Sequence, residues 1–331
     1  MDADQPWLIE DVGVGLGAAL ALSAANDVHV SYGGDGLRYS VRSGGRWTEE
    51  PVRGTDAVGQ TSLALDGGGH GHVVFSSNGR LWYGSNLDGD WSIEDVDIEP
   101  YGFPSIAVCD DGVVSLAYSA QGGLIRHTTN AGKVWTIETI AEDEGGGISV
   151  GLAVDAACGI HVAYRGGVPA SEYHVRYAWR DRGAWVLEDV DSESGSGASC
   201  SLTLDSEGGP HVSYDSRDGL LRYARREPSG WVVDSLGPEI AVVFPSLAVH
   251  GIDDVGIAFG HVRDDGATLS YIGRRKDDWR MEVIDDAHSG IPSLAFDSDG
   301  IPHIAYTGAT VGDVRYATRG APIMAEAECG D

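Results

Sequence analysis

Residues Asp297 to Gly308 read DSDGIPHIAYTG, and this phrase decides the fold because it recurs along the chain. Similar stretches carry a histidine at the same place: SAANDVHVSYGG around His29, DAACGIHVAYRG around His161 and DSEGGPHVSYDS around His211. A histidine that returns so often is not a lone active-site group. The recurrence indicates a repeat architecture instead.

The full repeat has the form S-L-A-x-D, then a histidine six residues after the aspartate, a tyrosine three residues later, an L-x-Y strand and a tryptophan. Its first strands begin at Ala18, Ser62, Ser105, Gly151, Ser201, Ser246 and Ser293. These starts lie roughly 43 to 50 residues apart, which is the length of a four-stranded propeller blade. The pattern therefore predicts seven blades.

Only six tryptophans open a fourth strand within these repeats. The seventh is at the other end of the chain, where WLIEDV from Trp7 reads like WSIEDV from Trp91 and WVLEDV from Trp185. We expect the strand at 7–12 to complete the last blade, which removes an exposed sheet edge. The predicted fold is an all-β, single seven-bladed β-propeller with four antiparallel strands per blade over residues 1–320, followed by a C-terminal tail at 321–331.

Charge and composition limit the partners. The chain has 51 acidic and 22 basic residues, a formal net charge of −29, which disfavours nucleic acid and anionic lipid. No run of about 18 apolar residues is present, so no membrane insertion is expected. We expect a monomer. The start MDADQPW enters the first strand at once, and we interpret the chain as a mature extracellular or periplasmic protein. The four cysteines lack CxxC spacing, and their pairing stays open.

The turns between third and fourth strands carry a family resemblance. TTNAGKVW (Thr128 to Trp135) is similar to the pattern S-x-D-x-G-x-x-W, and SVRSGGRW (Ser40 to Trp47) keeps its serine, glycine and tryptophan. The chain thus resembles bacterial seven-bladed propellers of the BNR or Asp-box kind, among which are sialidases, polysaccharide lyases and glycan-binding proteins. The resemblance implies a propeller and a glycan or polysaccharide partner. No catalytic motif of the family can be matched residue by residue, which disfavours a sialidase.

The repeated histidines allow two interpretations. They are His29, His72, His161, His211 and His303, and the other two repeats have Ser115 and Gly256 in this column. Four of the five have an aspartate six residues earlier, which favours a structural Asp–His pair across the turn. The alternative is a ring of imidazoles at the propeller axis that binds a transition metal such as copper, zinc or iron.

The opposite rim is the expected binding surface, because long variable loops on a rigid scaffold carry function. The expected loops are 97–103, 141–150, 165–174, 260–267 and 285–290. Candidate ligand-binding residues on them are Tyr101, Arg165, Arg263 and His288; Tyr173, His174 and His261 are candidate catalytic residues if the protein is an enzyme.

These rim residues give the functional prediction. A lectin-like carbohydrate-binding protein is expected, since aromatic and arginine side chains suit sugars. A polysaccharide lyase or glycoside hydrolase is the alternative, because a lyase needs a cation beside the uronate carboxylate and a histidine or tyrosine that exchanges protons. The acidic stretches EDEGGG from Glu142 and DSESGSG from Asp191 could hold structural calcium, although they lack EF-hand spacing.

Overall fold

The computed structural model describes residues 5–98, 100–131, 133–142, 147–167, 173–192, 197–237, 241–263, 266–275, 278–286, 290–307 and 312–320. The elements in this part of the chain are all β-strands, 27 of them. No helix long and apolar enough to span a membrane occurs in it. The predicted tail at 321–331 lies outside the described residues.

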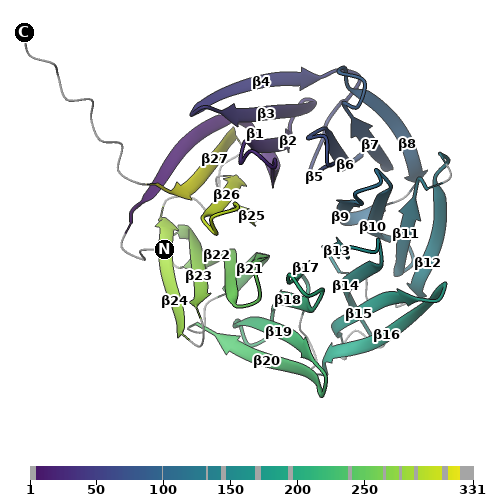
Figure 1. Ribbon diagram of the computed structural model, residues 1–331, viewed down its shortest axis with the longest axis vertical. Helices are drawn as coiled ribbons and strands as arrows, with labels where there is room; N and C mark the ends of the chain where they lie inside the picture. Colours follow the sequence, from purple (N-terminus) through teal and green to yellow (C-terminus); the bar gives the residue numbers. More distant parts are fainter. Residues whose placement is uncertain are drawn as a thin grey trace, which may run out of the picture.

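The strands form antiparallel sheets arranged around a central axis (Figure 1). Five sheets have four strands each. Their strands are β5 (Thr61–Leu65), β6 (Gly71–Ser77), β7 (Arg80–Ser85) and β8 (Ser92–Ile98); β9 (Pro100–Val108), β10 (Val114–Ala120), β11 (Leu124–Thr129) and β12 (Thr136–Glu142); β13 (Gly151–Val154), β14 (Ile160–Gly166), β15 (His174–Asp181) and β16 (Ala184–Asp191); β17 (Cys200–Leu204), β18 (Pro210–Asp215), β19 (Leu221–Glu227) and β20 (Gly230–Leu236); β21 (Ala241–His250), β22 (Asp254–Arg263), β23 (Gly266–Arg275) and β24 (Asp278–Asp285).

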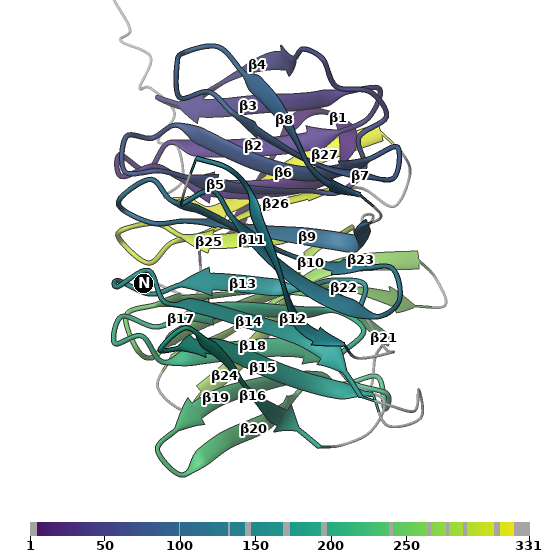
Figure 2. The same cartoon turned by 90° about the vertical axis from the view of Figure 1, so that its right-hand side faces the viewer.

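The remaining strands form one seven-stranded sheet in the order β25-β26-β27-β1-β2-β3-β4. They are β25 (Ser293–Phe296), β26 (Pro302–Thr307), β27 (Gly312–Arg319), β1 (Trp7–Leu22), β2 (Val28–Gly33), β3 (Leu37–Ser43) and β4 (Arg46–Val52). In side view the sheets lie one above another, and their strands run across the molecule (Figure 2).

Strand β1 connects the two ends of the chain. Its first half pairs with β27, from Trp7 opposite Arg319, and its second half pairs with β2, to Leu22 opposite Val28. The N-terminal strand therefore does pair with the last repeat, as predicted. The sequence pattern separated this strand from the one at Ala18, whereas the structure makes them one strand of 16 residues with a register shift in each half.

Two expected loops are largely strand. In the expected loop 97–103, β8 ends at Ile98 and β9 begins at Pro100. In the expected loop 260–267, Arg263 pairs with Gly266 as the last pair of the β22–β23 ladder. β9 begins in the first loop and β22 ends in the second, and each pairs with a neighbouring strand through a register shift. The extra residue lets a strand bend and continue instead of ending in a loop.

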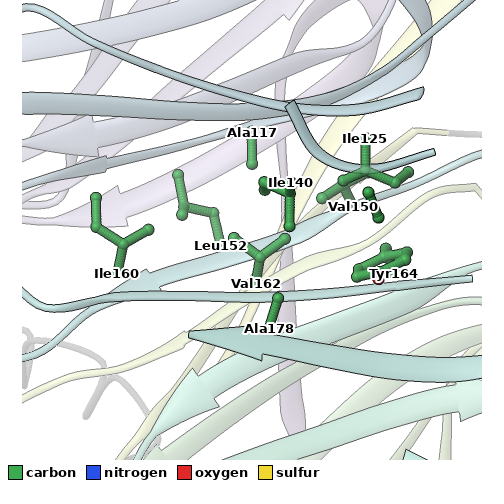
Figure 3. Close-up of a cluster of buried hydrophobic side chains, with 10 residues drawn as sticks. Ala117, Ile125, Ile140, Val150, Leu152, Ile160, Val162, Tyr164 and Ala178 are labelled. Carbon is green, nitrogen blue, oxygen red and sulfur yellow. The ribbon is translucent and has the colours of Figure 1, made fainter. Parts of the chain in front are cut away.

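The hydrophobic core lies between neighbouring sheets. Figure 3 shows one such layer, in which Ile125 and Ile140 from the β9–β12 sheet meet Leu152, Val162 and Tyr164 from the β13–β16 sheet. Side chains on one face of each strand are apolar because alternate residues of a strand point to the same face. Burial of these faces supplies most of the stabilisation that holds one sheet against the next.

Serine hydroxyls join the innermost strands of successive repeats. The backbone N–H of Leu20 donates to Ser293 Oγ at 2.9 Å, and that of Leu294 donates to Ser246 Oγ at 3.0 Å. The same bond runs from Leu247 to Ser201 at 3.1 Å. The serine that opens the S-L-A phrase is thus explained as a bridge that satisfies the exposed N–H of the next inner strand.

Candidate functional site

The five repeated histidines contact tyrosines of their own repeats. In each case Nδ1 lies 2.5–2.6 Å from the hydroxyl of the third-strand tyrosine. The pairs are His29–Tyr39, His72–Tyr83, His161–Tyr177, His211–Tyr223 and His303–Tyr316. This partner was absent from the sequence prediction, which considered the aspartate alone.

In three of these repeats the other ring nitrogen lies within hydrogen-bond distance of the aspartate six residues earlier. Nε2 of His211 lies 3.2 Å from Asp205 Oδ2, and Nε2 of His303 lies 3.3 Å from Asp297 Oδ2. His161 has the same contact with Asp155 at 3.5 Å. A carboxylate accepts the Nε2 proton, so Nδ1 accepts the proton that the tyrosine hydroxyl donates. The result is a repeated chain of hydrogen bonds, Tyr to His to Asp, which we name the latch.

Burial favours the neutral form of these imidazoles. It lowers the pKa of all five histidines below the usual value, and in His211 the Asp205 carboxylate opposes this shift only partly. The ring nitrogens point along the sheets to tyrosine and aspartate. Within the described part of the chain, the only set of three possible metal ligands that lie together is Cys109, Asp111 and Cys158, which includes no histidine.

The tyrosine of each latch also contacts the next repeat. The Tyr223 ring packs edge-on against Trp279, with ring centroids 5.2 Å apart, and Tyr177 packs in the same way against Trp231 at 5.4 Å. The indole N–H of Trp231 donates to Glu188 at 2.9 Å, back on the preceding sheet. Five tryptophans make this bond to a glutamate: Trp7, Trp47, Trp91, Trp135 and Trp231. These repeated polar residues therefore lie at the interfaces between neighbouring blades, each of which we call a seam.

The strongest candidate for a binding site lies at the other end of the sheets, where the first strands begin. Arg165 follows Tyr164 in β14, and its guanidinium lies 4.7 Å from the ring centroid of Tyr173. Asp215 occupies the corresponding place in β18, where its carboxylate accepts the N–H of Ser199 at 2.6 Å. Burial raises the pKa of Asp215, and the Arg165 charge opposes this shift.

Tyr101 lies on the same rim, on β9 of the neighbouring sheet. It is 55% exposed and sits opposite Ser119 in the β9–β10 ladder. The Ser119 hydroxyl donates to the carbonyl of Gly147, and a Cβ on Gly147 would lie 3.2 Å from the Arg165 Cβ. Tyr101 and Arg165 therefore belong to one surface, which with Tyr173 and Asp215 we name the rim cluster.

The other predicted site residues differ in accessibility. His261 has no exposed surface, and its Nδ1 lies 3.3 Å from the Ser270 hydroxyl, so a substrate on the rim does not reach it as the side chain stands. His174 Nε2 donates to Asp189 at 2.9 Å. His288 and the side chain of Arg263 lie outside the described structure, as do residues 143–146 and 193–196 of the two stretches considered for calcium.

A cavity of about 170 Å³ lies on the axis between the inner strands. Phe103 and Phe244, from β9 and β21, both line it, and their ring centroids are 5.6 Å apart. The backbone of Phe244 is left-handed, at φ 50°. A non-glycine residue in this conformation is strained. The left-handed backbone at Phe244 therefore accompanies the contact between the two rings. This contact lies at the end of the cavity where the inner strands begin.

Sequence reasoning missed Asp215, Phe103 and Phe244. A signal for each was present. The residue that follows the second-strand tyrosine or phenylalanine is small or hydroxylic in five repeats, and only Arg165 and Asp215 are charged. The phrase F-P-S opens two inner strands, at Phe103 and Phe244. Both signals are departures from the repeat rather than parts of it.

Comparison with protein-family models and with curated proteins found no match. Comparison with solved structures found propellers. A PL25 ulvan lyase bound to -[GlcA(1-4)Rha3S]- superposes with a TM-score of 0.67 and 15% identity over 94% of each chain. A mutant of the Aleuria aurantia lectin in complex with alpha-methyl-L-fucoside has a TM-score of 0.58 and 14% identity over 82% of this chain and 95% of the lectin.

A third similar structure is the SapL1 lectin in complex with alpha methyl fucoside, with a TM-score of 0.57 and 14% identity over 82% of this chain and 97% of the lectin. At such identities the likeness establishes the fold alone. The fold is that of a β-propeller, built from blades of four antiparallel strands.

Proposed function

We propose that the protein binds carbohydrate through the rim cluster. The observation that carries this proposal is Tyr101, a largely exposed aromatic ring on the same surface as the stacked pair Arg165 and Tyr173. An aromatic face packs against the apolar face of a sugar ring, and a guanidinium offers up to five N–H donors to hydroxyls or a carboxylate. The solved complexes of similar propellers with sugars support this proposal.

The second candidate is a polysaccharide lyase. It is favoured by the contact of Arg165 with Tyr173, because a cation beside a phenol supplies both charge neutralisation for a uronate and a group that exchanges protons. The likeness to the ulvan lyase, which extends over 94% of both chains, supports the same candidate. Of the predicted acid–base residues, Tyr173 is adjacent to the cation, whereas His261 is buried.

We further propose that the propeller has seven blades of the BNR or Asp-box-like kind. The seven-stranded sheet then counts as two blades that share β1, one with β25 to β27 and one with β2 to β4, which together with five four-stranded sheets makes seven. The turn at Asn130 supports the kinship, since its side chain accepts the N–H of Val114 at 2.8 Å and its carbonyl accepts that of Lys133.

An extracellular or periplasmic location belongs to the same proposal. Its support is the disulfide between Cys109 and Cys158, a bond that persists in oxidising compartments. A transition metal at the axis is not part of the proposal, because the latch geometry already accounts for the repeated histidines.

The test is binding by calorimetry to a panel that contains methyl fucoside, neutral polysaccharides and ulvan, with absorbance of the unsaturated uronate product recorded in parallel. We expect Tyr101→Ala to weaken binding about tenfold, which corresponds to about 1.4 kcal/mol, and to leave Tm unchanged. Leu87→Ala is the matched control, since Leu87 is 50% exposed in the turn after β7. Binding without product supports the lectin and product formation supports the lyase. Failure to bind any member of the panel contradicts both.

A further inference from the structure

Two repeats lack the latch histidine, one in the β9–β12 sheet and one in the β21–β24 sheet, where Gly256 stands in its place. In the β9–β12 sheet the column of the aspartate holds Cys109, that of the histidine holds Ser115, and that of the tyrosine holds His127. All three members of the hydrogen-bonded chain are thus replaced together. Ser115 is buried and too short to bridge the turn, so this repeat lacks the hydrogen bonds that the latch makes within other repeats.

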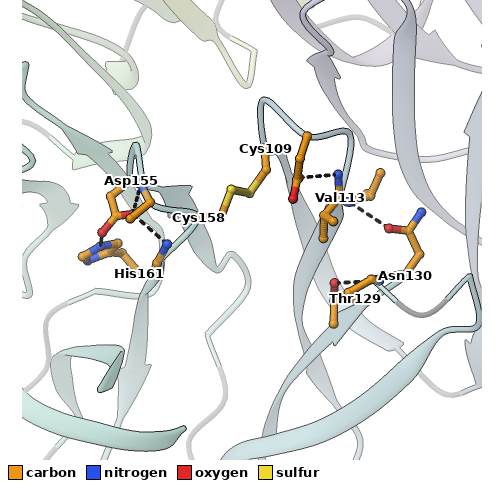
Figure 4. The surroundings of a disulfide bond; sticks show 12 residues. Cys109, Val113, Thr129, Asn130, Asp155, Cys158 and His161 are labelled. Atoms are coloured by element: carbon orange, nitrogen blue, oxygen red, sulfur yellow. Dashed lines mark hydrogen bonds and ion pairs between the residues drawn. A yellow bond between two sulfur atoms is a disulfide. The ribbon is translucent and has the colours of Figure 1, made fainter. Parts of the chain in front are cut away.

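The seam between this repeat and the next carries a covalent bond. Cys109, in the turn between β9 and β10, forms a disulfide with Cys158, in the turn between β13 and β14 of the next sheet (Figure 4). The two Cα atoms are 5.7 Å apart. Of the other cysteines, Cys200 is a buried free thiol, and Cys329 lies outside the described residues. The disulfide starts from the position that an aspartate occupies in four other repeats.

The noncovalent contacts of this seam are incomplete. His127 packs edge-on against Trp185, but both His127 Nε2 and Trp185 Nε1 are buried without a hydrogen-bond partner among the described residues. In other repeats the indole N–H bonds to a glutamate. Here the corresponding Glu138 instead accepts hydrogen bonds from His127 Nδ1 at 2.9 Å and from Arg180 at 2.5 Å. Two unpaired polar groups weaken the seam that the disulfide spans.

We propose that the Cys109–Cys158 disulfide replaces the missing latch and makes this one seam sensitive to reduction. A thiolate of a dithiol reductant attacks Sγ of Cys158, the more exposed of the two, and Cys109 leaves as a thiolate that takes up a proton. The second thiol of the reductant then releases Cys158. The sum is one disulfide reduced to two protein thiols and one dithiol oxidised to its disulfide.

The seam connects this switch to the rim. The two sheets joined by the disulfide carry Tyr101 on β9 and Arg165 on β14 at their opposite ends. Reduction therefore loosens the two blades that present the rim cluster. This consequence for ligand affinity rests on the proposed function, whereas the sensitivity of the seam itself does not.

The first arm of the test compares the full-length protein with and without dithiothreitol. In the reduced protein we expect two more thiols per chain and a Tm that is lower by about 3–6 °C. We also expect backbone amide hydrogens of the reduced protein to exchange at least about tenfold faster in β9 to β14 than in β17 to β24. A Cys158→Ser variant should show no response of Tm to the reductant. Unchanged Tm and exchange in fully reduced protein would overturn the proposal.

The second arm restores the latch without the disulfide. The variant Cys109→Asp/Ser115→His/His127→Tyr in the Cys158→Ser background should regain most of the Tm that Cys158→Ser alone loses. A folded variant without such recovery refutes the idea that the disulfide replaces the latch. If the variant does not fold, the reduction arm still decides the redox sensitivity. Sugar affinity is measured separately, so that absence of binding in the oxidised protein counts against the proposed function only.

Discussion

The latch around His211 allows a quantitative prediction. In the wild type the Tyr223 hydroxyl donates to His211 Nδ1 at 2.6 Å, and His211 Nε2 donates to Asp205 at 3.2 Å. His211→Phe keeps a ring of similar size and removes both bonds. Asp205 retains the backbone N–H groups of Glu207 and Gly209 on Oδ1. The variant therefore takes the histidine partner from both Asp205 Oδ2 and the Tyr223 hydroxyl, and the hydroxyl is the fully buried group of the two.

The magnitude follows from burial. Tyr223 has no exposed surface, and a buried hydroxyl without a partner costs about 1–3 kcal/mol. At about 2.1 cal/mol/K per residue, the unfolding entropy of 331 residues is about 0.7 kcal/mol/K. A loss of about 2 kcal/mol then lowers Tm by about 3 °C. Small as this shift is, differential scanning calorimetry resolves it.

The double variant His211→Phe/Tyr223→Phe makes the reasoning refutable. The double variant has no tyrosine hydroxyl to leave unpaired, and the loss at Asp205 Oδ2 is common to both variants. We therefore expect the double variant to be more stable than His211→Phe alone, by about 1–2 °C in Tm. Stabilities should be compared at a pH where histidine is neutral in both folded and unfolded chains. If the losses of Tm in His211→Phe and in Tyr223→Phe instead add in the double variant, the two side chains act independently and the latch does not exist as a unit.

Three further predictions concern the same framework. Stability should fall as pH decreases from about 7 to 5, because burial lowers the pKa of six histidines and the unfolded chain then binds more protons than the folded chain. Each histidine contributes up to about 1.4 kcal/mol to the free energy of unfolding per pH unit. Urea unfolding at several pH values measures this slope. Glu188→Ala removes the acceptor of both the Trp231 indole and the Arg226 guanidinium and should lower Tm by about 1–3 °C in a thermal melt. No loss of Tm would mean that water replaces the carboxylate. Gly256→Ala would place a Cβ 2.7 Å from the Tyr271 hydroxyl and should cost about 1–3 kcal/mol in chemical unfolding, while Gly59→Ala, with no atom within 4 Å of its Cβ, should not.

Much of the framework can be predicted from sequence because each repeat shows the same side chains at the same spacing. The aspartate and histidine of the latch are six residues apart across one turn, so their pairing needs no knowledge of register. The tyrosine is different. His211 lies opposite Arg225, and Ser213 lies opposite Tyr223, so His211 meets Tyr223 diagonally, two places away. Only the strand register reveals this contact.

The site is harder to predict for a related reason. Tyr101 and Arg165 are 64 positions apart in the printed sequence. They are connected through Ser119 and Gly147, which carry no chemical signal of their own. Expected loops also proved to be strand extensions, as at Arg263, because backbone pairing continued past the last repeated residue. Local sequence patterns identify the repeats, whereas the contacts at the rim depend on how each sheet is placed relative to the next.

The contrast between repeated and unrepeated residues bears on function. A side chain that occupies one column in most repeats performs in each repeat the work that holds blades together, as the contacts of His211, Trp231 and Ser246 illustrate. A glycan, in contrast, breaks the rotational symmetry of the ring wherever it binds. A site that binds one glycan, rather than one glycan per blade, needs residues that stand where one blade differs from the others. Arg165 and Tyr101 meet this criterion and the five histidines do not, which is why we expect ligand affinity to respond to the first pair and stability to respond to the second set.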